Sequence, residues 1–494
     1  MRDFKKLLIP AVILVILVGV YLLITYLPEK EDGDTDTTSK TERIQIFDFK
    51  KDDLTEILIE REDGVMQFRY VTIQVEQEKT DEEGNTVTEM VDRNVWQAVQ
   101  PEGMNVNSSS IDTIAWNANT LKAEKLIEEN PSNLAQYGLD KPVKLTFTMK
   151  DGTKHILHVG SKTPTGGAYY AKTANDTTVY TIGDYEAERF LRSKLELLVT
   201  DLYEKDDYTT KDFATLKFSR KGSLVFDAYA KEETVWWLTY PIDTEARYTN
   251  IVTICDSHAK LSVLKYVEED VEDLSKYGLA EPAYILEYKL DGRDYKLSIG
   301  SREQNSGDYY AILNDVNLVF TLPKNSFPYL DKPIEEIVSA FVYLVNINDV
   351  AEMRITMDGR TDISRINVDP DDDENSTYEF NGEVFHESRD EDEEYISLFK
   401  KYYQGAIGLT VDKVVLDEEP ELENPEVTIE YTLHTGEKVV VVLVPTPDGV
   451  SFYAFRNGKY TGMTLRQKQL TDEHNNGLRV SYPKLAEAIK ERKK

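Results

Sequence analysis

The chain has 494 residues, of which 90 are Asp or Glu and 57 are Lys or Arg, so its formal net charge is −33. A chain this acidic repels phosphate backbones, which argues against nucleic-acid binding. It is 40% hydrophobic and can therefore bury sizeable cores, and its length predicts roughly three domains. The one cysteine, Cys255, excludes an intramolecular disulfide and a multi-cysteine metal site.

The first notable segment is an uncharged apolar run that begins at Leu7 and ends at Leu27. As a helix it is long enough to cross the roughly 30 Å hydrocarbon core of a membrane. Basic residues precede it and acidic residues follow it, so the positive-inside bias places the N-terminus in the cytoplasm and the bulk of the chain outside. A cleaved signal peptide is the alternative, but such a peptide has a shorter apolar region and ends in small residues, whereas this run continues into Pro28. We therefore expect a single-pass anchor in the cell membrane, with residues 1–27 as cytoplasmic stub and transmembrane helix.

An internal repeat sets the expected architecture of the remaining chain. Residues 96–182 align without a gap on residues 236–322, at an offset of 140 residues. The matched motifs are Tyr137-Gly138-Leu139 with Tyr277-Gly278-Leu279, Asp151-Gly152 with Asp291-Gly292, Gly160-Ser161 with Gly300-Ser301, and Tyr169-Tyr170-Ala171 with Tyr309-Tyr310-Ala311. A third, degraded copy retains Pro425, Thr435-Gly436 and Tyr453-Ala454. The predicted divisions are a polar tether at 28–43, repeat 1 at 44–199, repeat 2 at 200–341 and repeat 3 at 342–494.

Each copy begins with an alternating strand pattern, at 54–60, 213–219 and 350–357. The first copy then carries an extra polar hairpin at 72–93, with Glu83-Gly84-Asn85 at its tip.

Apolar spacing next predicts an amphipathic helix at 109–126 in the first copy and at 249–264 in the second. The Tyr-Gly-Leu motif that follows is typical of a helix end, because glycine adopts the left-handed conformation there.

Alternating runs around Asp151-Gly152 and Asp291-Gly292 predict β-hairpins, and another strand pair is expected to turn at Asn175-Asp176. The predicted fold class is therefore α+β: one N-terminal transmembrane helix followed by three tandem repeats of mostly antiparallel sheet plus helices.

No catalytic, cofactor or metal site stands out in the sequence. His155 and His158 are three residues apart in a predicted strand, so their side chains point to opposite faces and cannot share a metal. The other four histidines have no acidic or histidine partner at ligand spacing. The acidic run from Asp369 to Asn375 imitates the start of a calcium loop, but Glu374 replaces its glycine and Phe380 its final glutamate. No nucleophile elbow occurs, and Cys255 occupies a helical core position, so we expect no enzyme activity and no cofactor.

The aromatic residues offer the only candidate contacts. Trp96 and Trp236 recur at equivalent positions and fit core packing best. Neighbouring strand residues point to opposite faces, so one tyrosine of each repeated pair is expected to be more exposed than the other. The candidate surface contacts are therefore Tyr169, Tyr170, Tyr309 and Tyr310.

The anchor and the tandem copies of Tyr-Gly-Leu-x-x-Pro, Asp-Gly, Gly-Ser-Lys/Arg and Tyr-Tyr-Ala together resemble the bacterial family catalogued as domain of unknown function 4340. The resemblance is strongest over residues 96–198, recurs over 236–322 and is weak from Tyr343 onward. It implies an extracytoplasmic accessory protein of the kind associated with ATP-binding-cassette exporters and gliding-motility auxiliary components. It implies no catalytic residues, because none are assigned in that family.

Three functional hypotheses follow. The first is a membrane-anchored, outward-facing accessory protein that binds the permease or ATPase subunits of an ATP-binding-cassette-type transport complex. The second is a cell-envelope module whose exposed aromatic residues bind wall polysaccharide or peptidoglycan. The third and least favoured is a hydrolase, because no pair of carboxylates is distinguished from the 90 acidic residues.

Overall fold

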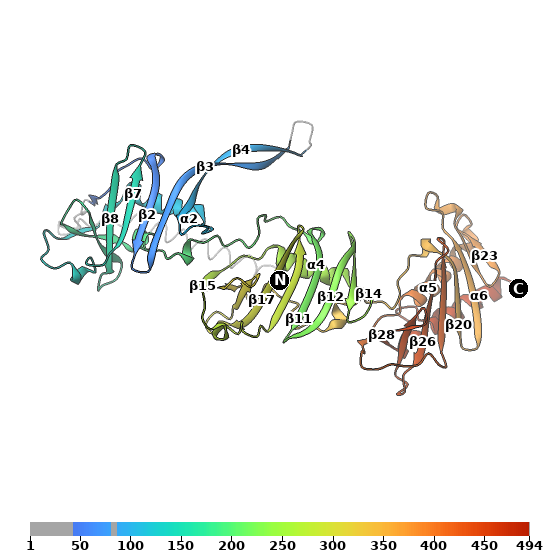
Figure 1. Cartoon of the computed structure of the whole chain (residues 1–494). Helices are drawn as coiled ribbons and strands as arrows, with labels where there is room; N and C mark the ends of the chain where they lie inside the picture. The colour runs from blue at the N-terminus through green and yellow to red at the C-terminus, as the bar shows by residue number, and fades with distance from the viewer. Residues whose placement is uncertain (1–42, 81–85, 494) are drawn as a thin grey trace, which may run out of the picture. The chain divides into compact units, whose positions relative to one another are not determined.

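The computed structural model describes residues 43–80 and 86–493, and this part of the chain is mostly antiparallel β-sheet (Figure 1). It contains strands β1 to β28 but only five α-helices of 7 to 15 residues. The predicted α+β class is therefore wrong, because antiparallel sheets dominate the residues that the structure describes. None of the described helices is long and apolar enough to cross a membrane. The apolar run that begins at Leu7 lies outside the described residues.

The first sheet has eight strands in the order β4-β3-β2-β7-β8-β9-β10-β6, and all its neighbouring strands are antiparallel. Its strands are β2 (Leu54–Arg61), β3 (Gly64–Thr80), β4 (Thr86–Gln100), β6 (Lys125–Glu128), β7 (Val143–Met149), β8 (Lys154–Lys162), β9 (Ala168–Thr173) and β10 (Val179–Gly183). A separate two-stranded sheet pairs β1 (Ile44–Gln45) with β5 (Lys122–Ala123).

The second sheet has nine strands in the order β14-β13-β12-β11-β16-β17-β18-β19-β15. These are β11 (Phe213–Arg220), β12 (Ser223–Glu232), β13 (Val235–Tyr240), β14 (Thr244–Glu245), β15 (Lys265–Glu269), β16 (Tyr284–Leu290), β17 (Arg293–Arg302), β18 (Tyr309–Leu313) and β19 (Leu318–Leu322). Its β11 lies beside β12 and β16, just as β2 of the first sheet lies beside β3 and β7, so the two sheets share one strand arrangement.

The third sheet repeats this arrangement in the order β23-β22-β21-β20-β25-β26-β27-β28-β24. Its strands are β20 (Val350–Met357), β21 (Arg360–Asn367), β22 (Thr377–Phe380), β23 (Glu383–His386), β24 (Lys413–Val414), β25 (Val427–Leu433), β26 (Lys438–Pro445), β27 (Ser451–Arg456) and β28 (Lys459–Arg466). Its β27 and β28 turn at Asn457-Gly458, both with positive φ, as a two-residue hairpin requires.

The α-helices are α2 (Ser108–Asn119), α3 (Asp184–Phe190), α4 (Tyr248–Ala259), α5 (Glu393–Ile407) and α6 (Leu478–Arg492). Short 3₁₀ helices are η1 (Lys51–Asp53), η2 (Ala135–Tyr137), η3 (Leu195–Leu197), η4 (Thr210–Asp212), η5 (Leu274–Tyr277), η6 (Ile334–Glu336), η7 (Ile347–Asp349), η8 (Asp373–Asn375), η9 (Asp390–Asp392) and η10 (Gln467–Thr471). Helix α4 buries one face against the second sheet, and α5 and α6 bury theirs against the third.

The chain divides into two compact units. One contains the first sheet, and the other contains the second and third sheets with residues Gly103–Ser110. The predicted boundaries between repeats stay a prediction.

The predicted central helices are too long at their C-terminal ends. Helix α2 ends at Asn119 and α4 at Ala259, and the chain then turns into short strands instead of continuing the helix. In the first unit these strands are β5 and β6, and β6 pairs with β10 at the edge of the sheet. Edge pairing satisfies the backbone there, which explains why helical spacing alone mispredicted the last turn.

Candidate functional site

The repeated Tyr-Gly-Leu and Gly-Ser motifs form one close backbone contact in each of the first two sheets. Gly138 has a φ of 65°, and a Cβ built on it would lie 2.8 Å from the backbone nitrogen of Ser161. A Cβ on Gly160 would overlap the carbonyl oxygen of Tyr137. In the second sheet, Gly278 and Gly300 repeat both contacts against Ser301 and Tyr277. These glycines are therefore required for the approach of the helix end to the sheet.

The tyrosine of this motif also recurs in a small polar cluster. The Tyr137 hydroxyl donates to Glu128 at 2.5 Å, and its ring lies 4.9 Å from that of Tyr170. In the second sheet, Tyr277 donates to Glu268 at 2.6 Å and lies 4.9 Å from Tyr310. Burial and the hydrogen bond to Glu268 raise the pKa of Tyr277 to about 12, so it stays a neutral donor. The cluster therefore fixes the sheet edge in each of the two copies.

The four candidate surface tyrosines are partly or wholly covered. Tyr169 and Tyr170 are both half-buried, and Lys162 lies over the ring of Tyr169. Tyr309 is buried with Arg302 over its ring, whereas its neighbour Tyr310 is half-buried. Tyr169 and Tyr170 belong to one compact unit, and Tyr309 and Tyr310 belong to the other.

Other polar candidates serve structural roles. Cys255 is fully buried in α4, and burial raises the pKa of its thiol. The Asp369 carboxylate accepts the backbone N–H groups of Asp371 and Asp372, which holds the pKa of Asp369 below its usual value. No group of three or more potential metal ligands occurs among the residues that the structure describes.

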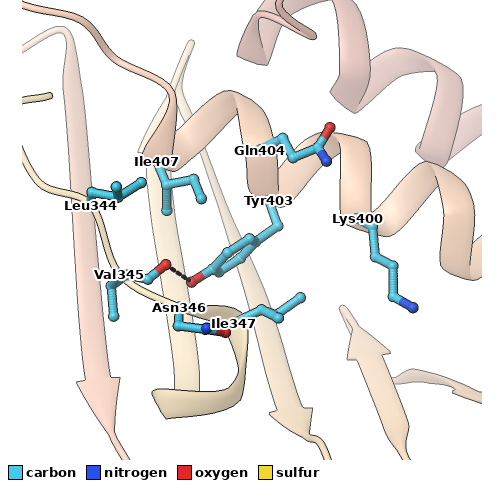
Figure 2. A pocket seen from close by; sticks show the side chains of 8 residues that line it. All are labelled: Leu344, Val345, Asn346, Ile347, Lys400, Tyr403, Gln404 and Ile407. Carbon is cyan, nitrogen blue, oxygen red and sulfur yellow. Dashed lines mark hydrogen bonds between the residues drawn. The ribbon is translucent and has the colours of Figure 1, made fainter. Parts of the chain in front are cut away.

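A concave site lies in the third repeat, between α5 and the segment that leads into β20. This pocket has a volume of about 400 Å³. Its lining residues are Leu344, Val345, Asn346, Ile347, Lys400, Tyr403, Gln404 and Ile407, and Figure 2 shows them arranged around the Tyr403 ring. Most of these side chains are apolar, so the pocket suits an apolar ligand group.

Hydrogen bonds hold the walls of the pocket in place. Tyr403 is 3% exposed and its hydroxyl donates to the carbonyl oxygen of Val345 at 3.0 Å (Figure 2). Burial raises the pKa of Tyr403, so this donor stays protonated. At the rim, Lys400 pairs with Glu387 at 3.1 Å and lies over the Tyr378 ring. The lysine charge is thus already compensated within the chain.

A second pocket of about 470 Å³ adjoins the first, since Leu344, Gln404 and Ile407 line both. Its far end is polar, where Gln469 bonds the backbone and side chain of Thr410. We call the two pockets together the α5 groove. It has an apolar end beside Leu344 and a polar end formed by Thr410, Gln469, His474, Asn475 and Asn476.

Leu344 is the most conspicuous residue of the α5 groove. It is 56% exposed although it borders an apolar pocket, and an exposed leucine at such a place resembles the apolar anchor of a protein interface. The predictions from the sequence do not include this site. The apolar run Tyr343-Leu344-Val345 precedes a strand pattern, but the run itself does not indicate that α5 lies beside it.

Two regions of the chain match one family model. The model for a domain of unknown function, DUF4340, matches over residues 96–265 and again over 236–402. The chain belongs to this family. The two overlapping matches together cover more than half of the 494 residues and confirm the internal repeat. No curated protein and no solved structure matches the chain.

Proposed function

We propose that this DUF4340 protein is a membrane-anchored accessory protein that binds a subunit of a membrane transport complex, of ATP-binding-cassette type, outside the cytoplasm. The apolar run from Leu7 to Leu27 supports the membrane location, although it lies outside the described residues. The observation that carries the binding role is the α5 groove with the exposed Leu344 at its edge.

The chemistry of the groove defines the partner segment. The apolar end accepts an aliphatic or aromatic side chain, and the polar end accepts backbone or amide groups next to it. The surrounding chain is acidic, with a net charge of −33, so a partner segment that carries basic residues beside its apolar anchor has the better electrostatic match. A sugar fits less well, because the Tyr403 ring is buried and its hydroxyl is already bonded to Val345.

The test is affinity purification of the tagged full-length chain from detergent-solubilised native membranes. We expect the wild type to recover an integral membrane partner together with its ATPase. Leu344→Asp should lose most of that partner, because a carboxylate would have to be desolvated in the apolar pocket. Val316→Asp is the matched control: Val316 is 58% exposed in the loop between β18 and β19, away from the groove, and its replacement should leave recovery unchanged.

Two results would remove the proposal. One is the absence of any membrane partner in all solubilisation conditions. The other is equal recovery by wild type and Leu344→Asp. Co-sedimentation of the same preparation with purified wall material would instead favour the polysaccharide-binding hypothesis.

A further inference from the structure

The free edge of the first sheet differs from the edges of the other two. The edge strand β4 has 15 residues and pairs only with β3. In the second sheet the equivalent strand β13 is covered by β14, and in the third β22 is covered by the four-residue β23. Long uncovered edges readily pair with another strand, and natural proteins usually shorten or cover them. Among the described residues nothing covers β4.

The outer half of β4 projects from the sheet in a two-stranded ribbon with β3 (Figure 1). The pairing of β2 with β3 ends at Arg69, so from Tyr70 onward β3 pairs with β4 alone in the described part of the chain. The ribbon exposes both of its faces because it has no core of its own. Such a ribbon is marginally stable in water unless it packs against something.

The two faces of this ribbon have different character. One carries Thr72, Gln74, Asp92 and Asn94, with hydrogen bonds of 2.7 Å between Thr72 and Asn94 and 3.4 Å between Gln74 and Asp92.

The other face carries the cross-strand pairs Val71 with Val95 and Val75 with Val91, and it continues to Val87, which is 42% exposed. Between these valines the same face carries Ile73 with Arg93 and Gln77 with Glu89. This valine face lies on the side of the sheet opposite the buried Trp96, so it does not contribute to the core.

We propose that two copies of this chain pair antiparallel along their β4 edges, with Val91 of one copy opposite Val91 of the other. The two copies are then related by a two-fold axis that passes between the two Val91 residues. The two sheets form one continuous sheet, and their valine faces lie on the same side of it. In this register Val87 lies opposite Val95 of the second copy, and Glu89 lies opposite Arg93, each pair occurring twice. Neither Glu89 nor Arg93 forms an ion pair with a side chain that the structure describes, and in this register the second copy supplies the complementary charge.

Other registers match poorly. A two-fold axis at Glu89, Asp92 or Arg93 would place like charges opposite each other, which is unfavourable across neighbouring strands. An axis at Met90 would place Glu89 opposite Val91 and Arg93 opposite Val87, so it would leave both charges unpaired, whereas the axis at Val91 leaves only Asp92, opposite Met90, unpaired. Axes nearer either end of β4 shorten the overlap. Charge complementarity and valine pairing thus select the register centred on Val91.

The first test is disulfide crosslinking of the full-length chain in detergent. Val91→Cys should give a disulfide-linked dimer under mild oxidation, because opposed residues of antiparallel strands have Cα atoms within the range that a disulfide spans. The natural Cys255 is buried and should not interfere. Val87→Cys is the register control and should stay monomeric, because the two positions 87 lie far apart in this arrangement.

The second test reverses charges in the Val91→Cys background. Arg93→Glu alone and Glu89→Arg alone each place like charges opposite each other and should abolish most of the crosslinked dimer. The double variant Glu89→Arg with Arg93→Glu restores opposite charges and should restore it. Glu76→Lys, on the polar face of β3, should leave the yield unchanged.

Three results would overturn the proposal. They are failure of Val91→Cys to crosslink at concentrations where Val87→Cys crosslinks, equal yields for both cysteine variants, and failure of the charge swap to restore the dimer. If the wild type sediments as a monomer at every concentration tested, the edge does not bind a second copy. Because the ribbon lies outside the α5 groove, loss of the dimer and loss of the transport partner are separate outcomes.

Discussion

The first and second sheets share one arrangement of strands, but the side chains that fill their cores differ in polarity. At the centre of the first sheet, Phe147 packs among the rings of Phe47 and Phe190. Its equivalent in the second sheet is Tyr288, since both lie on the strand next to the opening strand and face equivalent buried residues. The Tyr288 hydroxyl bonds that of Tyr203 at 2.6 Å.

The helices change together with the strands. Ala118 of α2 corresponds to His258 of α4, and both are fully buried. The His258 ring lies 5.1 Å from Tyr288, and its Nε2 atom bonds the Tyr329 hydroxyl. The first core is thus nearly apolar, whereas the second contains hydrogen-bonded polar groups, Tyr203 with Tyr288 and His258 with Tyr329. The backbone contact between the Tyr-Gly-Leu and Gly-Ser motifs is therefore the same in both sheets, whereas the core residues differ.

The largest expected effect on stability comes from disrupting the backbone contact between the repeated motifs, which both sheets share. Gly300→Ala would place a Cβ on the carbonyl oxygen of Tyr277, a backbone atom that cannot move without disturbing the helix end. We expect a loss of about 3 kcal/mol in the free energy of unfolding. Urea unfolding of the full chain, followed by tryptophan fluorescence, measures it, because all four tryptophans lie in the first two repeats.

Gly292→Ala is the matched control for this variant. Gly292 has a φ of 75°, but a Cβ placed on it would meet no atom of the described residues within 4 Å, so only the backbone preference opposes alanine. The expected loss is about 1 kcal/mol. Equal losses for the two variants would show that the close approach of the motifs is unimportant.

The second prediction concerns a difference between the sheets, the buried histidine. Burial lowers the pKa of His258 to about 3, and its Nδ1 atom has no hydrogen-bond partner among the described residues. The unfolded chain takes up a proton near pH 6.5, whereas the folded chain does not until about pH 3. Stability is therefore fully present above pH 6.5 and falls as the pH decreases, by up to about 1.4 kcal/mol per pH unit.

His258→Leu should remove this dependence. Between pH 6.5 and 4.5 we expect the second repeat of the wild type to lose about 2 to 3 kcal/mol more than the variant does, as measured by urea unfolding at each pH. At pH 8 the variant should be less stable, since the Tyr329 hydroxyl loses its partner. Parallel pH profiles for both proteins would refute the assignment of acid sensitivity to this residue.

Local signals in the sequence correctly predicted several helix ends and turns, although the predicted fold class was wrong. The helix stops at Gly138 and Gly278 follow from glycine in the left-handed conformation, and both have positive φ. The hairpins at the two Asp-Gly pairs also form as predicted. These features depend on a few neighbouring residues, so one sequence is enough to find them.

Features that depend on pairing at a distance were missed. The gapless alignment matches Phe147 with Glu287, but the structure matches it with Tyr288. Phe147 pairs with His155, eight residues later, whereas Tyr288 pairs with Tyr295, seven residues later, so the two hairpins differ by one residue. Counting identical residues in a gapless alignment does not detect a shift of one residue within a single strand. The α5 groove and the uncovered β4 edge likewise arise from which elements lie beside which, and no local pattern encodes that.

The smallest expected effect on stability comes from variants that replace polar core residues of the second sheet with the apolar type found in the first. Tyr288→Phe introduces the residue type found at Phe147, but it leaves the buried Tyr203 hydroxyl without its partner, so we expect a loss of about 1 kcal/mol. Tyr203→Phe alone should cost a similar amount. The double variant should cost clearly less than the sum, because removing both hydroxyls leaves no unsatisfied group. Urea unfolding of all four proteins gives the coupling energy, and strict additivity would mean that the two hydroxyls do not stabilise each other.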